Sequence, residues 1–171
     1  MNKTRYYSHE DVADIVAYAH ARGVRVVPEF ELLGHATAIC DDLKGAGVVC
    51  CHGKWGMGQL GDDPAGNTSR LIGALLTEMT SLFPDAVVHI GGDEAAYQPT
   101  GPCTIDASQI LEEKTMRQVL ALGKQPMGWQ EILLETGAAA SIPEAIIQPW
   151  STPGTWYVYP PLFRALFFGL H

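Results

Sequence analysis

The stretch that decides the fold is VVHIGGDEAAY, residues 87–97, where an apolar run ends in two glycines and two adjacent acids. Neighbouring side chains on a regular strand point to opposite faces. Asp93 and Glu94 can therefore serve one substrate only if the strand ends or bends just before them. Gly91 and Gly92 permit such a bend, because glycine adopts backbone conformations that other residues avoid. The stretch predicts a buried strand that delivers two carboxylates at its carboxyl end.

Helices and strands alternate on either side of this stretch. Apolar residues at helical spacing predict helices that begin near Ser8, Thr68 and Ser108, and a short helical piece over 131–135. Buried strands are predicted over 25–30, 86–90, 127–129 and 145–150. The segment 32–66 is glycine-rich without sustained periodicity and is predicted to be a loop. This alternation indicates an α/β fold with a parallel sheet.

A (β/α) barrel and an open doubly wound sheet both fit this order. Polar or aromatic side chains follow each predicted strand, in the groups Glu29, Glu31 and His35; Asp93 and Glu94; Trp129 and Glu131; and Trp150. Barrel enzymes build their active sites at that face from several strands, so the clusters favour the barrel. The chain shows neither a GxGxxG nor a P-loop pattern, which leaves a nucleotide-binding sheet unsupported.

Composition and charge exclude several classes of function. The 171 residues are 47% hydrophobic and 18% charged, as in an ordinary globular domain. A net charge of −8 argues against nucleic-acid binding through a basic surface. The first residues are polar and lack the apolar core of a signal peptide. The apolar stretch at the carboxyl end is too short to span a bilayer.

An isolated Asp-Glu pair most often lies in a solvated turn or at a helix N-terminus. Here the apolar strand and the glycine pair favour a desolvated site, in which one acid keeps its proton near neutral pH and the other stays ionised. Two such carboxylates suggest glycoside hydrolysis. The acid and nucleophile of the usual scheme lie on different strands. The adjacency of Asp93 and Glu94 therefore fits a scheme whose nucleophile is not a protein group.

The tryptophans and His35 extend this interpretation. A single tryptophan usually packs in a core, but Trp129 and Trp150 both end predicted strands. They suggest an aromatic wall that stacks on a sugar ring, with indole N–H groups bonding its hydroxyls. Glu29, Glu31 and His35 raise the question of a metal. Their spacing matches no standard zinc motif, so we predict neither a metal nor another cofactor.

The four cysteines, Cys40, Cys50, Cys51 and Cys103, match no metal-binding spacing. Buried thiols and a single long-range disulfide both remain open from the residues alone. Asn67 begins an N-T-S pattern, which is a short and unspecific signal for N-glycosylation.

Four ordered segments resemble the catalytic domain of glycoside hydrolase family 20, the β-N-acetylhexosaminidases. They are ARGVRVVPEFELLGHATA (21–38), LFPDAVVHIGGDE (82–94), MGWQEIL (127–133) and AIIQPW (145–150). The resemblance implies a (β/α)8 TIM barrel, which needs about 250 residues. We therefore expect residues 1–150 to form a partial catalytic domain with about four of the eight strands. Residues 151–171 are expected to be a divergent tail.

The resemblance implies substrate-assisted, retaining catalysis, an exception to the two-carboxylate scheme. Glu94 would be the general acid, and Asp93 would orient the 2-acetamido group of the substrate. The acetamido oxygen would attack the anomeric carbon and form an oxazolinium intermediate. His35 matches the family histidine that hydrogen-bonds the acid.

The same resemblance assigns the pocket around the acetamido group. Trp129 and Trp150 match its aromatic walls, and Tyr157 is the candidate for the tyrosine that bonds the acetamido carbonyl. Leu33 departs from the family pattern, which usually has proline there. The family's arginine that grips sugar hydroxyls, its third aromatic wall and a late acidic residue have no counterpart.

The resemblance predicts an enzyme that removes terminal N-acetylhexosamine from glycans or chitin oligosaccharides. We expect the chain to be truncated relative to the whole enzyme, and its open sheet edges predict a homodimer. The alternatives are a non-catalytic sugar-binding or pseudoenzyme fragment, and a doubly wound domain of other function. Animal members imply a disulfide between Cys51 and Cys103, with Cys50 as the substitute for Cys51, in a lysosomal or extracellular protein.

Overall fold

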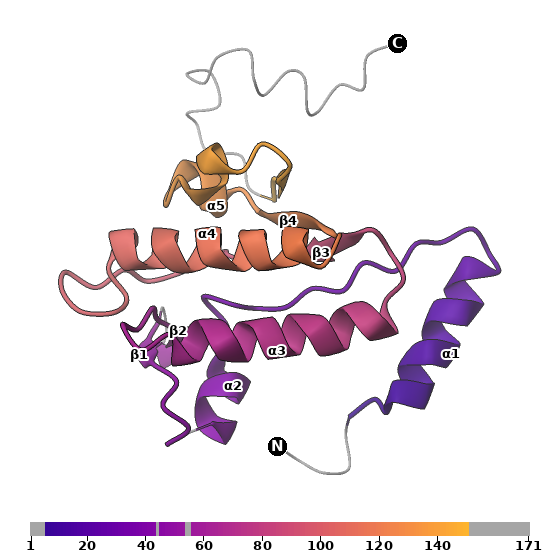
Figure 1. The fold of residues 1–171 in the computed structure, drawn as a ribbon, viewed down its shortest axis with the longest axis horizontal. Coiled ribbons are helices and arrows are strands. Elements are labelled where there is room, and N and C mark those ends of the chain that lie inside the picture. The colour runs from indigo at the N-terminus through magenta and orange to yellow at the C-terminus, as the bar shows by residue number, and fades with distance from the viewer. Residues whose placement is uncertain (1–5, 44, 54–55, 151–171) are drawn as a thin grey trace.

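The computed structural model describes residues 6–43, 45–53 and 56–150 (Figure 1). The elements run in the order α1 (His9–His20), α2 (Thr37–Asp42), β1 (Cys50–His52), β2 (Gly58–Leu60), α3 (Asn67–Leu82), β3 (Val87–His89), α4 (Ile105–Ala121), β4 (Gln125–Trp129), α5 (Glu131–Leu134), η2 (Ala138–Ser141) and β5 (Ile146–Gln148). Within these ranges the strands form a parallel sheet, β3-β4-β5, and an antiparallel hairpin, β1-β2. No helix in this part of the chain is long and apolar enough to cross a membrane.

The parallel sheet follows the order of the chain. Val87 of β3 lies opposite Gln125 of β4, and Met127 of β4 lies opposite Ile146 of β5. Helix α4 connects β3 to β4. A doubly wound sheet reverses its strand order at a switch point, whereas barrel strands succeed one another without reversal. Over the described residues the order shows no reversal, which agrees with a barrel segment.

The first predicted strand, 25–30, is wrong over most of its length. The segment makes a single parallel bridge, Glu29 with His89. The amide of Phe30 donates to the His89 carbonyl at 2.9 Å, and the amide of His89 donates to the Pro28 carbonyl at 2.9 Å. Val24 and Val27 are 56% and 37% exposed, because no strand among the described residues covers their outer side. The count of four parallel strands is thus not confirmed, since the described residues hold three and this bridge.

The segment 32–66 contains more structure than its composition predicted. It holds α2 and the hairpin β1-β2, in which Cys50 lies opposite Leu60. A six-residue helix and three-residue strands are too short to produce a readable period. Disulfides join Cys40 to Cys50 and Cys51 to Cys103. The second is the pair implied by the resemblance, while the first was not anticipated.

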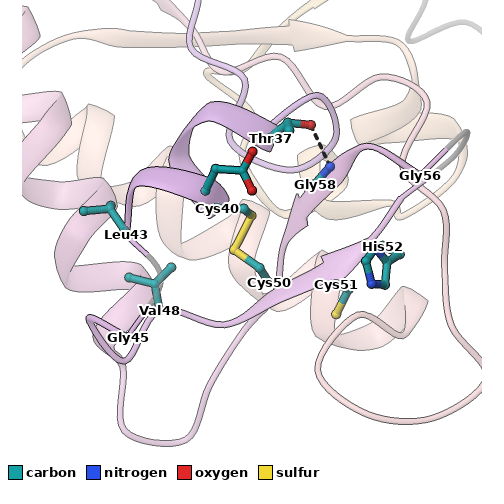
Figure 2. Close-up of a pocket in the computed structure, with 11 residues that line it drawn as sticks. Thr37, Cys40, Leu43, Gly45, Val48, Cys50, Cys51, His52, Gly56 and Gly58 are labelled. Carbon is teal, nitrogen blue, oxygen red and sulfur yellow. Dashed lines mark hydrogen bonds between the residues drawn. A yellow bond between two sulfur atoms is a disulfide. The ribbon is translucent and has the colours of Figure 1, made fainter. Parts of the chain in front are cut away.

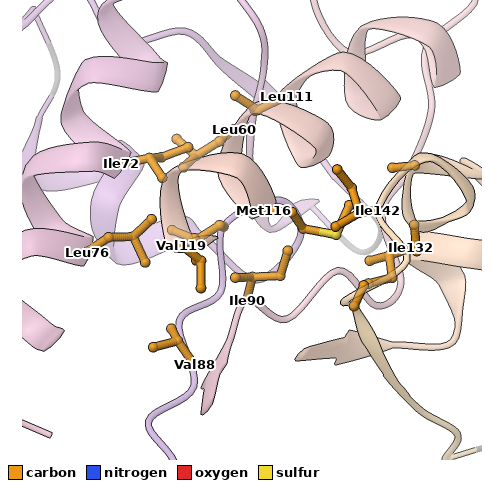
Figure 3. Close-up of a cluster of buried hydrophobic side chains, with 14 of the residues drawn as sticks. Leu60, Ile72, Leu76, Val88, Ile90, Leu111, Met116, Val119, Ile132 and Ile142 are labelled. Carbon is orange, nitrogen blue, oxygen red and sulfur yellow. The ribbon is translucent and has the colours of Figure 1, made fainter. Parts of the chain in front are cut away.

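Helices α3 and α4 lie side by side (Figure 1), and α4 packs against β4. The buried side chains of both helices and those at β3 form one cluster (Figure 3). It includes Ile72 and Leu76 of α3, Met116 and Val119 of α4, Val88 of β3, and Ile90, which directly follows β3. Burying a side chain of this size stabilises a fold by roughly 1.5–3 kcal/mol. This cluster fixes the β3–β4 edge from which the candidate site extends.

The helix starts follow local capping chemistry. Ser8 and Asp11 form the predicted capping box of α1. Helix α4 begins three residues before the predicted Ser108, because the Thr104 hydroxyl accepts from the Ala107 amide. In contrast to α3 and α4, α1 buries no side chain among its own residues.

Candidate active site

The two acids follow β3 as the sequence predicted. The strand ends at His89, and Gly91 and Gly92 then adopt φ angles of 68° and 97°. A Cβ at Gly91 would lie 2.4 Å from Glu31 Oε2, and one at Gly92 would lie 2.4 Å from Ile132 Cγ2. Both the backbone conformation and the lack of space therefore require glycine. The turn presents Asp93 and Glu94 at the carboxyl end of the strand.

His35 lies between the two acids. Its Nε2 is 3.5 Å from Asp93 Oδ2 and 3.5 Å from Glu94 Oε2. The three side chains are 28%, 19% and 26% exposed, so solvent reaches each of them although most of their surface is covered. A Cβ at Gly34 would lie 2.6 Å from the Asp93 carbonyl oxygen. The loop that carries His35 thus packs backbone against backbone on the loop that carries the acids.

His35 and Glu94 also share an unusual backbone conformation. Among the described non-glycine residues, they are the two with positive φ, at 52° and 50°. This region costs an ordinary residue on the order of 1–3 kcal/mol, and such strained residues cluster at functional sites. Because these two residues also lie next to each other, the conformational cost is concentrated at one place, as expected for a functional site.

The tryptophans lie at the same edge of the sheet, but their indole N–H groups are already used. Trp129 Nε1 donates to Glu29 Oε1 at 2.7 Å, and Trp150 Nε1 donates to Glu131 Oε1 at 3.0 Å. The Trp129 amide donates to the Gly91 carbonyl at 3.0 Å, which fixes it beside the acid turn. The expectation that these indole N–H groups bond sugar hydroxyls stays a prediction, although both groups have protein partners in this structure. Nearby carboxylates accept them instead.

His89 is buried beneath this edge. The Gly91 amide donates to His89 Nδ1 at 3.0 Å, and the His89 and Trp129 rings meet edge-on at 4.8 Å. Burial lowers the pKa of His89, against the opposing charges of Glu29 and Asp93. The neutral ring that accepts from Gly91 carries its proton on Nε2, so the 3.3 Å approach of Glu29 to Nδ1 is not a donated hydrogen bond.

Several carboxyl groups around Asp93 resist ionisation. Burial raises the pKa of Glu31 to about 7, and the charges of Asp93 and Glu29 add to this effect. Burial also raises the pKa of Glu131, partly offset by its hydrogen bonds, including that from Trp150. The negative charge of Asp93 contributes to the raised pKa of both glutamates. Glu31, which follows Glu29, and Glu131, which follows β4, therefore lie near the acid turn after β3.

Sequence reasoning missed Glu112. This residue of α4 is fully buried, accepts from the Thr136 hydroxyl, and lies behind Gly92. Burial raises its pKa to about 8. Its helical spacing from the core residues Met116 and Val119 was the available signal, because an acid in an apolar stripe is exceptional.

The structure also shows which other candidates come together. His35, Asp93 and Glu94 each offer one ligand atom, all within 4.8 Å of one another, and this is the set among the described residues that could hold a metal ion. The set of Glu29, Glu31 and His35 considered from sequence is not such a group there. Tyr157 and the predicted tail over 151–171 lie outside the described residues.

A cavity of about 370 Å³ lies between α2 and the hairpin (Figure 2). Thr37, the Cys40–Cys50 disulfide, His52 and Gly58 line it. None of the candidate catalytic or sugar-binding residues is part of its lining. The acids and tryptophans instead lie along the carboxyl edge of the parallel sheet.

Comparison with known families agrees with this arrangement. The model of "Glycosyl hydrolase family 20, catalytic domain" matches residues 1–158, a range that includes Tyr157. β-Hexosaminidase A of Caenorhabditis elegans is 32% identical over 167 residues, which cover 84% of this chain and 29% of that protein. β-Hexosaminidase of Porphyromonas gingivalis is 31% identical over 170 residues, which cover 85% of this chain and 21% of that protein. The chain thus spans less than a third of these relatives.

Solved structures give the same result. The chitobiase of Flavobacterium johnsoniae matches with a TM-score of 0.69 and 28% identity, over 86% of this chain and 25% of that one. The family 20 β-N-acetylhexosaminidase of Streptomyces coelicolor matches with a TM-score of 0.67 and 27% identity, over 88% of this chain and 30% of that one. The described fold is accordingly part of the barrel that these enzymes share.

Proposed function

Since this chain belongs to glycosyl hydrolase family 20, we propose that it carries the acid and acetamido-binding part of a β-N-acetylhexosaminidase site. The observation that carries the proposal is the position of His35 Nε2, 3.5 Å from a carboxylate oxygen of each acid. The substrates would be glycans or chitin oligosaccharides with a terminal N-acetylhexosamine.

In this proposal the adjacent acids have separate tasks. Glu94 donates its proton to the glycosidic oxygen as the bond to the anomeric carbon breaks. Asp93 accepts the N–H of the 2-acetamido group, whose carbonyl oxygen forms the new bond to that carbon. Water then opens the oxazolinium and returns a proton to Glu94, so configuration is retained. His35 holds the two carboxylates in place.

The spacing of the acids argues against an inverting mechanism. Carboxylate oxygens of Asp93 and Glu94 lie within 4.8 Å of each other. An inverting enzyme leaves about 6.5–9.5 Å between its carboxyl groups to admit a water. The acids also leave one turn side by side, so neither lies opposite the other across a sugar ring. An internal nucleophile removes the need for that opposition.

The acetamido pocket in this proposal is walled by Trp129 and Trp150 through their ring faces. Their attachment to Glu29 and Glu131 supports it, because a bond to the ring N–H lies at the edge of an indole and does not itself cover an apolar face. Tyr157 is proposed as the donor to the acetamido carbonyl, on the strength of the resemblance.

The assay is release of an aryl group from aryl β-N-acetylglucosaminide by the purified chain. Glu94→Gln should lower the rate by about 10²–10⁴-fold, the usual value of general acid catalysis. Glu144→Gln is the matched control, since Glu144 is an exposed acid outside the site. A folded chain that binds N-acetylglucosamine without turnover would support the non-catalytic alternative.

We also propose a homodimer in an oxidising compartment. The two disulfides support a lysosomal or extracellular setting. Several large apolar side chains are exposed in the first described segments: Tyr6, Tyr7, Ile15, Tyr18, Val24 and Val27. In this proposal they form the interface between the two copies. Sedimentation equilibrium tests it, and a monomer at assay concentration would refute it.

A further inference from the structure

Each wall tryptophan is attached to a glutamate that has no part in the proposed proton transfer. Trp129 Nε1 donates to Glu29 at 2.7 Å across 100 residues of sequence. Trp150 Nε1 lies 3.0 and 3.2 Å from the two carboxylate oxygens of Glu131. The same arrangement thus occurs twice, at the end of β4 and just after β5.

The Trp150 attachment is the more completely built. Glu131 is 6% exposed, in the first turn of α5, while Trp150 is 51% exposed. The Trp150 amide also donates to Gln130 Oε1 at 3.1 Å. Because about half of the Trp150 surface is exposed, few packing contacts restrain the orientation of its ring. Hydrogen bonds from its ring and its backbone to α5 and its N-cap supply that restraint.

The Trp129 attachment links the aromatic wall to the strand edge. Glu29 forms the parallel bridge with His89, whose ring meets Trp129 edge-on at 4.8 Å. The Trp129 amide is bonded to Gly91, two residues before Asp93. Trp129 is therefore fixed at its backbone amide, at its ring N–H and by the T-shaped contact with His89.

We propose that Glu29 and Glu131 are positioning residues that set the ring planes of Trp129 and Trp150, and through them the width of the acetamido pocket. This inference rests on the proposed function for its ligand. A planar carboxylate suits the role because it accepts an indole N–H while leaving both ring faces uncovered.

The contacts are tested first, without ligand, on the ¹⁵N-labelled chain. Its four tryptophans give a small set of indole N–H signals, of which two are assigned with Trp129→Phe and Trp150→Phe. Glu131→Ala should shift the Trp150 signal and spare that of Trp129, and Glu29→Ala should do the reverse. Glu144→Ala is the control and should shift neither. A Trp150 signal unmoved by Glu131→Ala would overturn the inference.

The consequence is tested by titrating N-acetylglucosamine. The Kd should rise about tenfold in each alanine variant, because the hydrogen bond that orients the indole ring is lost and one such bond corresponds to about a tenfold change in affinity. Glu29→Gln and Glu131→Gln keep an acceptor oxygen and should recover most of the affinity. An unchanged Kd in folded alanine variants would overturn the positioning role. If the alanine variants do not fold, the indole signals of the glutamine variants provide the test. An amide oxygen is a weaker acceptor than a carboxylate, so Glu29→Gln should still shift the Trp129 signal and Glu131→Gln the Trp150 signal. Unmoved signals would overturn the inference.

Failure of the proposed function gives a different result. If N-acetylglucosamine moves no indole signal of the wild-type chain, the sugar site is wrong. The ligand-free shifts would still decide whether the two attachments exist.

Discussion

His35 Nε2 lies 3.5 Å from Glu94 Oε2, and both residues hold a left-handed backbone, with φ angles of 52° and 50°. Two loops distant in sequence therefore bring strained residues into contact. Packing of Gly34 against the Asp93 carbonyl holds the loops at this separation. The strain is understandable if the acid must project from the end of β3 at an angle that a relaxed turn would not give.

Replacing Glu94 by glycine should separate stability from activity. Glu94→Gly removes the acid and relieves the left-handed strain, whereas Glu94→Ala removes the acid and keeps the strain. We expect both to lose turnover, and Glu94→Gly to be more stable than Glu94→Ala by about 1 kcal/mol. Urea unfolding of the two variants measures this difference. Equal stabilities would show that the backbone at Glu94 is not strained.

Gly34→Ala should disrupt the contact between the two loops. The new Cβ would meet the Asp93 carbonyl at 2.6 Å, a backbone atom that cannot rotate away. We expect a loss of about 1–3 kcal/mol in unfolding free energy and a loss of turnover. Gly73→Ala in α3 is the control, because its Cβ would make ordinary contacts of 3.4–3.6 Å with the Gln118 side chain of α4. That control should stabilise the chain by about 0.5–1 kcal/mol, and a harmless Gly34→Ala would refute the close packing.

The sequence predicted the parts of the fold that have strong local patterns. Ser8 with Asp11 and the apolar stripe of α3 are long, regular signals, and the structure contains both helices. The segment 25–30 failed because its apolar residues resemble a buried strand, while burial depends on a neighbour that local sequence does not reveal. The hairpin of β1 and β2 failed because three residues carry no period.

Stability should fall as the pH rises from mildly acidic values. Glu112 and Glu31 have folded pKa values of about 8 and about 7, above the 4.5 of an exposed glutamate. The stability linked to these groups is complete below pH 4.5 and is lost as the pH rises through their folded pKa values. For Glu112 this amounts to a few kcal/mol between about pH 5 and pH 8.

Glu112→Gln is the variant that tests this dependence. Its amide oxygen can still accept from Thr136 but does not titrate. Urea unfolding at pH 5 and pH 8 should give a smaller difference for the variant than for the wild-type chain. An identical difference would show that Glu112 ionises freely in the folded state.

The two disulfides should contribute unequally. They close loops with sequence separations of 52 and 10 residues, Cys51–Cys103 and Cys40–Cys50. Chain-entropy arguments give about 4 kcal/mol for the longer loop and about 3 kcal/mol for the shorter. Paired alanine variants and their unfolding free energies provide the comparison. A larger loss from the Cys40–Cys50 pair would mean that the hairpin, rather than loop closure, dominates.

The site was predictable only as far as residue type and order allow. The glycine pair before Asp93 revealed a strand that ends in two acids, and the structure ends β3 at that point. The attachment of Trp129 to Glu29 was not predictable, because its partners are 100 residues apart and meet only through the sheet. Glu112 was overlooked because its burial comes from packing of α4 against Thr136 and the acid turn.

The most direct measurement compares aryl β-N-acetylglucosaminide with the matching aryl β-glucoside, which has a hydroxyl in place of the acetamido group. If the substrate supplies the nucleophile, the wild-type chain should release the aryl group from the first and not from the second. Glu94→Gln should abolish the release. Equal rates with both substrates, or no release from either by a folded chain, would contradict the account.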